Sequence, residues 1–246
     1  SRLGCFATPG APEVPIIMHS GRDSAHVPAW ADPEEWLDEV EAVRDARERA
    51  EELGCTPMGR GMAAVLRLLA VTQGAQTVVE VGTGTGVSGA ALLSALGDSG
   101  TLTTIDVEAE HQRVARETFA ALGFDHVRSR LIAGRALQVL PRLADASYDM
   151  VVADSDRTEY PAILHQATRL LRPGGLVAFA SVLGYVQSNR ASVGRRGGMS
   201  YQDEADAMDE LVRSVHGDDR WVAAMVPVDD GLLVATWLGS RADEGS

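Results

Sequence analysis

Cysteine is scarce in this chain of 246 residues, which contains Cys5 and Cys55 alone. Two cysteines so far apart match neither the ligand spacing of a zinc site nor a disulfide framework, so both classes of protein are disfavoured. Long apolar runs are missing too, because no stretch approaches the roughly 20 residues that a membrane-spanning helix needs. We therefore expect a cytoplasmic protein without a membrane partner.

Positive charge is also in short supply. Lysine and arginine number 22 against 35 aspartates and glutamates, which gives a formal net charge of −13. Proteins that bind a nucleic-acid backbone carry a basic face, so we expect no nucleic-acid partner. A hydrophobic content of 45% and a charged content of 23% are ordinary for a globular chain. The length suits one α/β domain with a sizeable core.

Proline and glycine divide the chain into a folded domain and its ends. Residues 1–31 are rich in proline, glycine and small polar residues, and we interpret them as an N-terminal arm. The folded domain is expected to span residues 32–240, with a tail at residues 241–246. Residues 184–200 contain three arginines, several glycines and few apolar residues. They predict either a lid at the ligand-binding edge or a disordered crossover.

The chain is organised around a strand, a glycine-rich turn and a helix. Thr77–Val81 is a β-branched run that predicts a short buried strand. Gly82, Gly84 and Gly86 follow at alternate positions, and residues 89–96 predict a helix. This order is typical of the first βαβ unit of a nucleotide-binding fold, where a helix N-terminus faces a negative group.

The register of the glycines separates two classes of cofactor. Gly84, Gly86 and Gly89 satisfy the dinucleotide pattern G-x-G-x-x-G. In that motif, however, the first glycine directly follows the strand. Here that residue is Gly82, and no glycine then stands at the third position. Glu80 followed by three alternate glycines fits the E-x-G-x-G-x-G loop of S-adenosylmethionine (SAM) enzymes better, and an NAD-type oxidoreductase is the alternative.

Two acids follow strands in the positions that a nucleoside cofactor uses. Residues 101–105 predict a strand that ends at Asp106, 24 residues after Gly82. An acid there can accept hydrogen bonds from both ribose hydroxyls of an adenosine. Residues 147–153 predict a strand that brings Asp154 to the carboxyl edge of the sheet, where open α/β sheets bind ligands.

Strand and helix patterns alternate along the rest of the chain. Further strands are expected at residues 126–133, 176–180, 221–226 and 232–237. Helices are expected at residues 32–53, 59–72, 108–122, 134–143, 159–171 and 201–216. The fold class is therefore α/β, a Rossmann-like seven-stranded and mostly parallel sheet with helices on both faces. A short loop joins the last two strands, which predicts an antiparallel C-terminal hairpin. Asp32 at the N-cap, Pro33 at the first helical position and Glu35 three residues after the cap predict the start of the first helix by a capping box.

Four motifs in order resemble one family, the class I SAM-dependent O-methyltransferases of the catechol and caffeoyl-CoA type. Within it the chain resembles an actinobacterial branch of the bacterial family 3 enzymes. The motifs are residues 79–88, 102–106, 154–160 and 170–175. The resemblance covers about residues 56–237. It implies SAM as cofactor, a sheet whose last strand is antiparallel, and a homodimer.

The resemblance also implies which residues bind the cofactor. For the methionine end of SAM they are Thr56, Glu80, Gly82, Thr83, Gly84 and Ser88. Asp106 matches the acid that binds the ribose. Arg135 and Ala136 match the turn along the adenine, and Asp154 matches a carboxylate shared by metal and SAM.

The chain departs from this family where the chemistry takes place. The family's divalent-metal site needs Asp154 plus an Asp-Asn pair, but Ala180 and Ser181 stand at the pair's positions. One carboxylate is a poor site for Mg²⁺, so we expect no bound divalent metal. Arg157 replaces a lysine base and stays protonated, so it cannot take a proton. We expect Asp154 to act as the base and Arg157 to position the acceptor.

These features predict SAM-dependent methylation of a small-molecule acceptor, on oxygen, without assistance from a metal. The alternative is a protein that binds SAM or S-adenosylhomocysteine, has lost methyl transfer and has a regulatory or assembly role. His111 is expected at the surface, and His165 is expected on a helix face without a catalytic role.

Overall fold

The computed structural model describes residue 34, residues 37–184 and residues 201–239. The expected arm and C-terminal tail lie outside the described residues. So does the lid-like loop, apart from its first residue. Among the described residues, no helix combines the length and the apolar character needed to cross a membrane.

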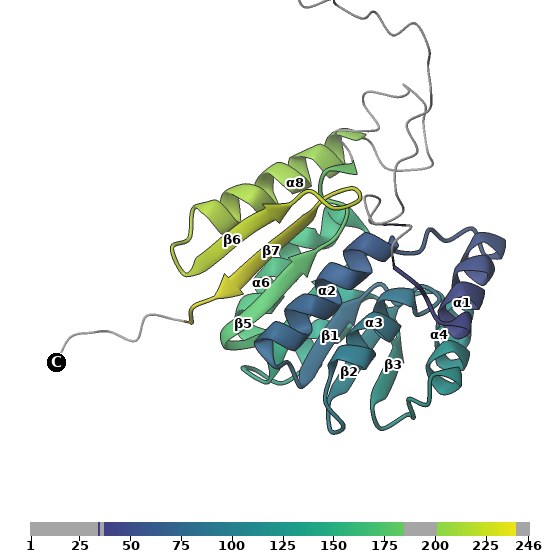
Figure 1. The fold of residues 1–246 in the computed structure, drawn as a ribbon. Helices are drawn as coiled ribbons and strands as arrows, with labels where there is room; N and C mark the ends of the chain where they lie inside the picture. Colours follow the sequence, from purple (N-terminus) through teal and green to yellow (C-terminus); the bar gives the residue numbers. More distant parts are fainter. Residues whose placement is uncertain (1–33, 35–36, 185–200, 240–246) are drawn as a thin grey trace, which may run out of the picture.

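A seven-stranded sheet forms the centre of the molecule, in the order β3-β2-β1-β4-β5-β7-β6 (Figure 1). The first five strands in this order pair in parallel, and β7 is antiparallel to both of its neighbours. The bounds are β1 Thr77–Val81, β2 Thr101–Asp106, β3 Ser129–Ala133, β4 Tyr148–Ala153, β5 Leu171–Phe179, β6 Trp221–Val226 and β7 Leu232–Trp237. The expected fold class and the C-terminal hairpin are confirmed.

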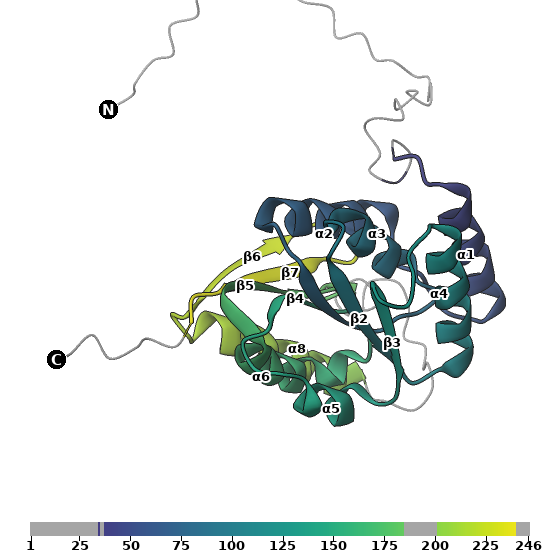
Figure 2. The same cartoon turned by 90° about the horizontal axis from the view of Figure 1, so that it is seen from below.

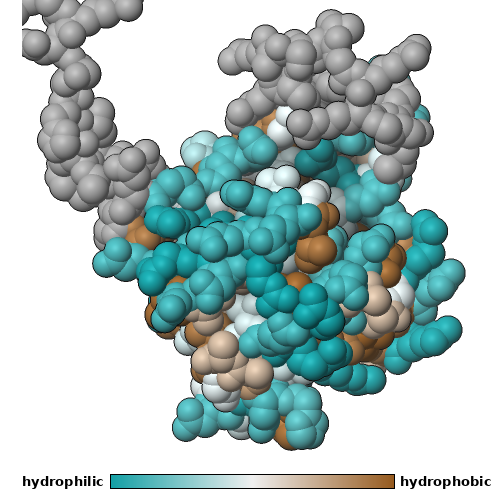
Figure 3. Space-filling view, turned by 90° about the vertical axis from the view of Figure 1, so that its right-hand side faces the viewer, coloured by the Kyte–Doolittle hydropathy of each residue, from teal (hydrophilic) through white to brown (hydrophobic). Residues whose placement is uncertain are grey.

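Helices cover both faces of the sheet (Figure 2). One layer contains α2 and α3, and the opposite layer contains α5, α6 and α8. The bounds are α1 Glu41–Glu52, α2 Arg60–Gln73, α3 Val87–Ala95, α4 Ala109–Ala121, α5 Ala136–Val139, α6 Tyr160–Leu170 and α8 Tyr201–His216. The face that carries α1 and α4 is mostly hydrophilic (Figure 3). Arg49 of α1 and Glu117 of α4 form an ion pair there.

The β-branched run in β1 is buried because the strand lies between two hydrophobic cores. Val78 packs into the core under α2 and α3, whereas Val79 and Val81 pack into the core under α6 and α8. A strand covered on both faces needs apolar residues at successive positions, not an alternating pattern. This explains why a short apolar run was enough to predict the strand.

The first helix begins later than its capping-box pattern predicts. Residues 37–40 are not helical, and α1 starts at Glu41. Glu34, expected inside that helix, instead accepts hydrogen bonds from the backbone N–H groups of Arg60 and Gly61, at 2.8 and 2.6 Å. The first N–H groups of a helix have no partner within the helix, and α2 has no side-chain cap at Gly59. A carboxylate from a distant segment caps α2 instead.

The same helix end receives a second carboxylate from the far end of the chain. Asp229, in the turn between β6 and β7, accepts a hydrogen bond from the N–H of Met62 at 3.2 Å. A Cβ atom on Gly59 would lie 2.3 Å from Asp229 Oδ2, so a larger residue there would displace this carboxylate. Two segments that are far apart in sequence therefore meet at the start of α2.

Three other boundaries differ from the expected ones. β3 starts at Ser129, not at residue 126, because Asp125 Oδ1 accepts the N–H groups of Val127 and Arg128 and holds them in a turn. β5 starts at Leu171, and its register against β4 shifts before Leu176, so residues expected to form a turn belong to an irregular strand. The helix expected at residues 134–143 is the short α5 followed by a 3₁₀ turn with a proline near its start.

Candidate functional site

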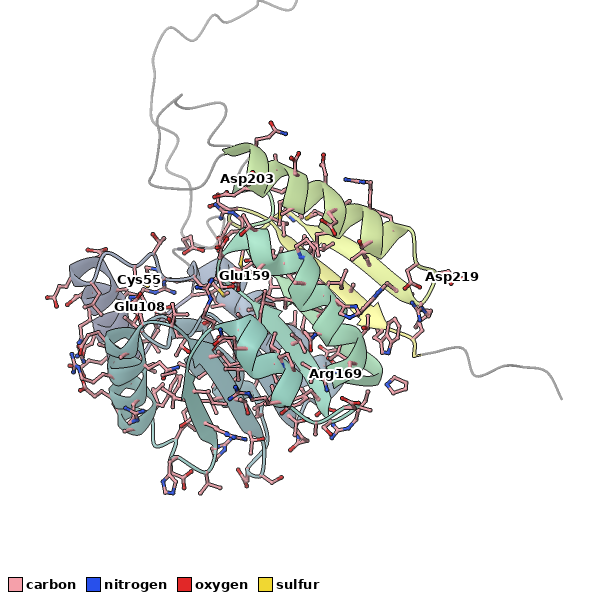
Figure 4. The ribbon with its side chains drawn as sticks, turned by 180° about the vertical axis from the view of Figure 1, so that it is seen from behind. Cys55, Glu108, Glu159, Arg169, Asp203 and Asp219 are labelled. Atoms are coloured by element: carbon pink, nitrogen blue, oxygen red, sulfur yellow. The ribbon has the colours of Figure 1, made fainter. Side chains whose placement is uncertain are left out.

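A cavity of about 530 Å³ opens at the carboxyl edge of β1, β2 and β4. This volume is within the range of roughly 300–1,000 Å³ that is usual for small-molecule sites. Nine of the ten residues expected to bind the cofactor line it: Thr56, Gly82, Thr83, Gly84, Ser88, Asp106, Arg135, Ala136 and Asp154. Cys55, Glu108 and Glu159, which also line it, mark its position in Figure 4. Glu80 and Arg157 are not on the cavity wall.

The glycine loop is tightly packed, and two of its glycines leave no room for a side chain. Gly82 has a φ of +96°, and a Cβ atom on it would lie 2.0 Å from the carbonyl oxygen of Asp154. Gly86 has a φ of +91°, and a Cβ atom there would lie 3.0 Å from Ala115 in α4. The ends of β1 and β4 therefore approach each other closely, and backbone N–H groups at the start of α3 are available to a ligand.

Asp106 is oriented by the glycine loop. Its Oδ2 accepts a hydrogen bond from the N–H of Gly84, and its Oδ1 accepts one from the N–H of Glu108, both at 2.9 Å. The side chain is 9% exposed. Each carboxylate oxygen can accept more than one hydrogen bond, so both oxygens can still accept one from a ligand hydroxyl group. This arrangement suits a pair of neighbouring ribose hydroxyls.

Glu80 is a fully buried carboxylate next to the loop. Its Oε2 accepts a hydrogen bond from the hydroxyl of Thr104 at 2.6 Å, and the hydroxyls of Thr104 and Thr83 lie 2.8 Å apart. Burial raises the pKa of Glu80 to about 7. The three side chains connect the glycine loop to β2, so Glu80 acts on the cavity through Thr83.

Asp154 lies where β4 ends, and its backbone N–H donates to the carbonyl of Val81 at 2.8 Å. Burial raises the pKa of its carboxyl group to about 6, and the positive charge of Arg157 opposes this shift. Asp229 is a further acid whose charge raises the pKa of Asp154. A carboxyl group with a pKa close to neutrality is suited to exchange a proton with a bound ligand.

Arg157 forms an ion pair with Glu204, a partner that the sequence did not suggest. Its Nε and Nη2 donate to Glu204 Oε2 on α8, at 3.2 and 3.1 Å. Both side chains are about 30% exposed. The ion pair joins the 3₁₀ turn at Arg157–Glu159 to α8, so part of the charge of Arg157 is neutralised before any acceptor binds.

The end of β5 offers no carboxylate to a metal. Ala180 is fully buried, and its carbonyl oxygen lies 3.1 Å from the hydroxyl of Tyr160, which can donate to it. Ser181 follows with a φ of +56°. In the described part of the chain, no group of three or more His, Cys, Asp and Glu side chains could hold a metal ion. These residues do not fit the octahedral oxygen site that Mg²⁺ requires.

Two buried hydroxyl groups on the cavity wall are well placed for a ligand. Thr85 Oγ1 and Ser155 Oγ are shielded from solvent and have no hydrogen-bond partner among the described residues. Buried polar atoms without a partner are rare in proteins, because each one costs free energy. They indicate that the cavity is built to hold a polar molecule.

Several residues of the cavity wall were not found from the sequence. His111, expected at the surface, lines the cavity with its Nδ1 3.6 Å from Asp106 Oδ2. Its position five residues after Asp106, in the first turn of the helix that follows β2, was the signal that could have identified it. Cys55 and Met58 also line the cavity, and they come from the connection between α1 and α2, where no motif drew attention to them.

Comparison with known proteins identifies this arrangement. A family described as O-methyltransferase matches residues 34–238. A protein of Mycobacterium tuberculosis strain H37Rv, named "Probable O-methyltransferase Rv1220c", is 41% identical over 230 residues, which cover 93% of this chain and 97% of that protein.

Solved structures agree with this result. The O-methyltransferase TomG from Streptomyces achromogenes, solved with SAM, has a TM-score of 0.72 and 26% identity, over 83% of this chain and 92% of TomG. A Corynebacterium glutamicum protein has a TM-score of 0.72 and 28% identity, over 86% of this chain and 95% of its own. The chain therefore belongs to the O-methyltransferase family, whose members use SAM as the methyl donor.

Proposed function

We propose that this enzyme transfers the methyl group of SAM to a hydroxyl oxygen of a small molecule, without a bound divalent metal. The observation that carries the proposal is the cavity in which Asp106 and Asp154, from two different strands, meet the glycine loop. The solved relative TomG takes part in tomaymycin synthesis, which supports a small-molecule acceptor. Titration calorimetry with SAM and S-adenosylhomocysteine tests the cofactor, and loss of binding in Asp106→Ala tests the cavity.

The cofactor would lie along the cavity wall from Asp106 to Asp154. Asp106 would accept hydrogen bonds from the two ribose hydroxyls, and Arg135 and Ala136 would contact the adenine. Thr56, Gly82, Thr83, Gly84 and Ser88 would surround the methionine end. Glu80 would support this end from behind the loop through Thr83 and Thr104, since it is not on the wall.

Asp154 is the base in the proposed reaction. SAM, when bound, supplies a methyl group activated by a sulfonium. Asp154 would accept the proton of the acceptor hydroxyl while that oxygen takes the methyl group and S-adenosylhomocysteine leaves. The products are the methyl ether, S-adenosylhomocysteine and a protonated Asp154 that returns its proton to solvent. Alignment of the acceptor in a cavity shielded from water supplies the rest of the rate enhancement.

Arg157 has a positioning role in this proposal. Its ion pair with Glu204 fixes the segment that carries Asp154, and its charge opposes the effect of burial on the pKa of Asp154. An anionic acceptor could compete with Glu204 for the guanidinium group. Arg157 itself cannot serve as a base.

The alternative function is cofactor binding without methyl transfer, in a regulatory or assembly role. Two observations favour it: Ala180 and Ser181 remove the family's metal ligands, and Glu204 already neutralises Arg157. A protein of this kind would bind S-adenosylhomocysteine but methylate no member of a panel of phenols, catechols and alkyl alcohols. Methylation of any panel member that is lost in Asp154→Ala would rule it out.

The expected homodimer is supported by the exposed edge of the sheet. Trp221–Val226 contains no charged residue, and its central residues are exposed, with Val222 at 62% and Met225 at 40%. Uncharged edge strands are unusual in soluble proteins because they pair with other chains. We propose that a second copy covers β6, and sedimentation of the wild type and of Val222→Lys tests this. The cytoplasmic location stays a proposal, to be tested by cell fractionation.

A further inference from the structure

His111 occupies the cavity wall beside the residue that is expected to bind the ribose. It lies in the first turn of α4, and its side chain is 20% exposed. Its Nδ1 is 3.6 Å from Asp106 Oδ2, slightly beyond hydrogen-bonding distance. Both residues line the same cavity. The imidazole is therefore close enough to interact with Asp106 and is also accessible to a ligand.

The hydrogen bonds of Asp106 determine where a ligand can approach. The N–H of Gly84 reaches Oδ2 from the glycine loop, and the N–H of Glu108 reaches Oδ1 from the turn before α4. The carboxylate cannot rotate without breaking one of these bonds. A ribose hydroxyl that donates to Oδ2 must therefore use the acceptor position that Gly84 leaves, and His111 Nδ1 lies 3.6 Å from the same oxygen.

We infer that His111 is a further cofactor-binding residue, which shares the ribose of SAM with Asp106 and makes cofactor affinity depend on its own protonation. The inference rests on the proposed binding of SAM in this cavity. It concerns the nucleoside end of the cofactor, which takes no part in the transfer of the methyl group.

The two protonation states of the imidazole have opposite effects on the ribose. Neutral histidine has one N–H donor and one acceptor nitrogen, so it can make a hydrogen bond to a hydroxyl group and leave Asp106 free. Protonated histidine carries a positive charge and two donors, and it is attracted to the Asp106 carboxylate. It then competes for the acceptor position on Oδ2 that the ribose hydroxyl needs. It also adds positive charge to a cavity that holds the SAM sulfonium. Cofactor affinity should thus fall as His111 gains a proton.

Other ionisable groups line the same cavity, and their effects on ligand binding must be distinguished from the effect of His111. Cys55, Glu108 and Arg135 line the wall from three different segments. Asp154 and Glu80 have pKa values raised to about 6 and about 7, so they change charge in the pH range that histidine uses. Both belong to the methionine end in the proposed arrangement. The charge of Asp106 is one of those that raise the pKa of Glu80, so a nucleoside at Asp106 still senses Glu80. His111→Gln keeps both acids, so a difference between this variant and the wild type reports on His111.

The test compares two histidine variants by titration calorimetry. His111→Gln keeps hydrogen-bonding atoms but cannot be protonated, and His165→Gln is the matched control on an exposed position of α6. Adenosine and S-adenosylhomocysteine are titrated at pH 5.5, 6.5 and 7.5, in two buffers that differ in ionisation enthalpy. The difference between the buffers gives the number of protons released on binding.

For the wild type and His165→Gln, we expect adenosine to bind about fivefold more weakly at pH 5.5 than at pH 7.5, the size of a partly exposed charge interaction. Both proteins should release protons on binding at the lowest of the three pH values. In His111→Gln the pH dependence and the proton release should both be smaller. The same pH profile and proton release in His111→Gln and wild type would overturn the inference.

Two controls keep the outcomes separate. If the wild type binds neither ligand, the proposed cofactor site fails, which is a different result from an unchanged pH profile. Thermal unfolding of each variant shows whether the fold is intact. NMR of the imidazole signals adds a direct measurement: the His111 signals should shift on addition of S-adenosylhomocysteine, and those of His165 should not.

Discussion

Arg157 and Glu204 form an ion pair across 47 positions of sequence, with Nη2 of the arginine 3.1 Å from Oε2 of the glutamate. Arg157 follows β4, where the proposed base stands, and Glu204 lies in the first turn of α8. The charge of this arginine lowers the pKa of Asp154, against the larger effect of burial. Glu204 therefore influences the base without touching it.

Removal of Glu204 should shift the pH dependence of methyl transfer. In Glu204→Gln the charge of Arg157 is no longer neutralised, so the pKa of Asp154 should fall. The acid limb of the rate profile should move to lower pH by less than about one unit. Arg157→Gln should move it to higher pH. Glu210→Gln, at an exposed position of α8, should leave the profile unchanged. Equal profiles for all of these variants would contradict the role given to the ion pair.

Asp154 should make the folded protein less stable as the pH rises. Burial raises its folded-state pKa from the usual 3.8 to about 6, so the folded state holds this proton more tightly than the unfolded state. The free energy of unfolding should therefore fall, through this group, between about pH 4 and pH 6. Asp154→Asn should raise it at pH 7.5 by about 1 kcal/mol and abolish methyl transfer. Denaturant titration at pH 4 and pH 7.5 measures this, and a variant less stable than wild type at pH 7.5 would disprove it.

Gly82→Ala should lower the free energy of unfolding by more than backbone strain at a positive φ alone would. The added Cβ would lie 2.0 Å from the carbonyl oxygen of Asp154. Gly74 also has a positive φ, but a Cβ atom there would meet nothing within 4 Å. We expect Gly74→Ala to cost about 1–2 kcal/mol of unfolding free energy from backbone strain alone. Gly82→Ala should cost about 3 kcal/mol or more and weaken S-adenosylhomocysteine binding. Equal losses in the two variants would show that the close approach is unimportant.

Methyl transfer should not depend on a divalent metal. Enzyme treated with EDTA should keep its rate, and added Mg²⁺ should not increase it, because Ala180 and Ser181 supply no carboxylate. The double variant Ala180→Asp, Ser181→Asn is the matched test, since it introduces the family's missing pair. A rate that EDTA removes and Mg²⁺ restores in the unmodified enzyme would refute metal independence.

The sequence predicted the strands, and it predicted residues that lie together at one edge of the sheet, because the signals for both are local. A β-branched run followed by Gly82 fixes the end of β1, and Asp106 ends β2 at the same edge. Parallel pairing then brings the two positions together without further information. Nine of the ten expected cofactor residues line one cavity for this reason.

The remaining features depend on contacts between distant segments. Glu34 was expected in the first turn of the first helix, but its carboxylate binds the uncapped start of α2. Glu204 is one of many acids on an amphipathic helix, and nothing in its neighbourhood indicates that it pairs with Arg157. His111 lies on a helix whose other charged residues face solvent, so its orientation became clear only from the helix position against β2.

The two carboxylates at the start of α2 have a consequence for the order of assembly during synthesis. Glu34 and Asp229 are separated by most of the chain, and Met62 and Asp229 by 167 positions. Met58, four residues before Met62, forms part of the cavity wall. During synthesis, α2 can receive its second carboxylate only after the hairpin of β6 and β7 has been made. We therefore expect the cavity wall at Met58 to reach its final geometry after nearly the whole chain has emerged.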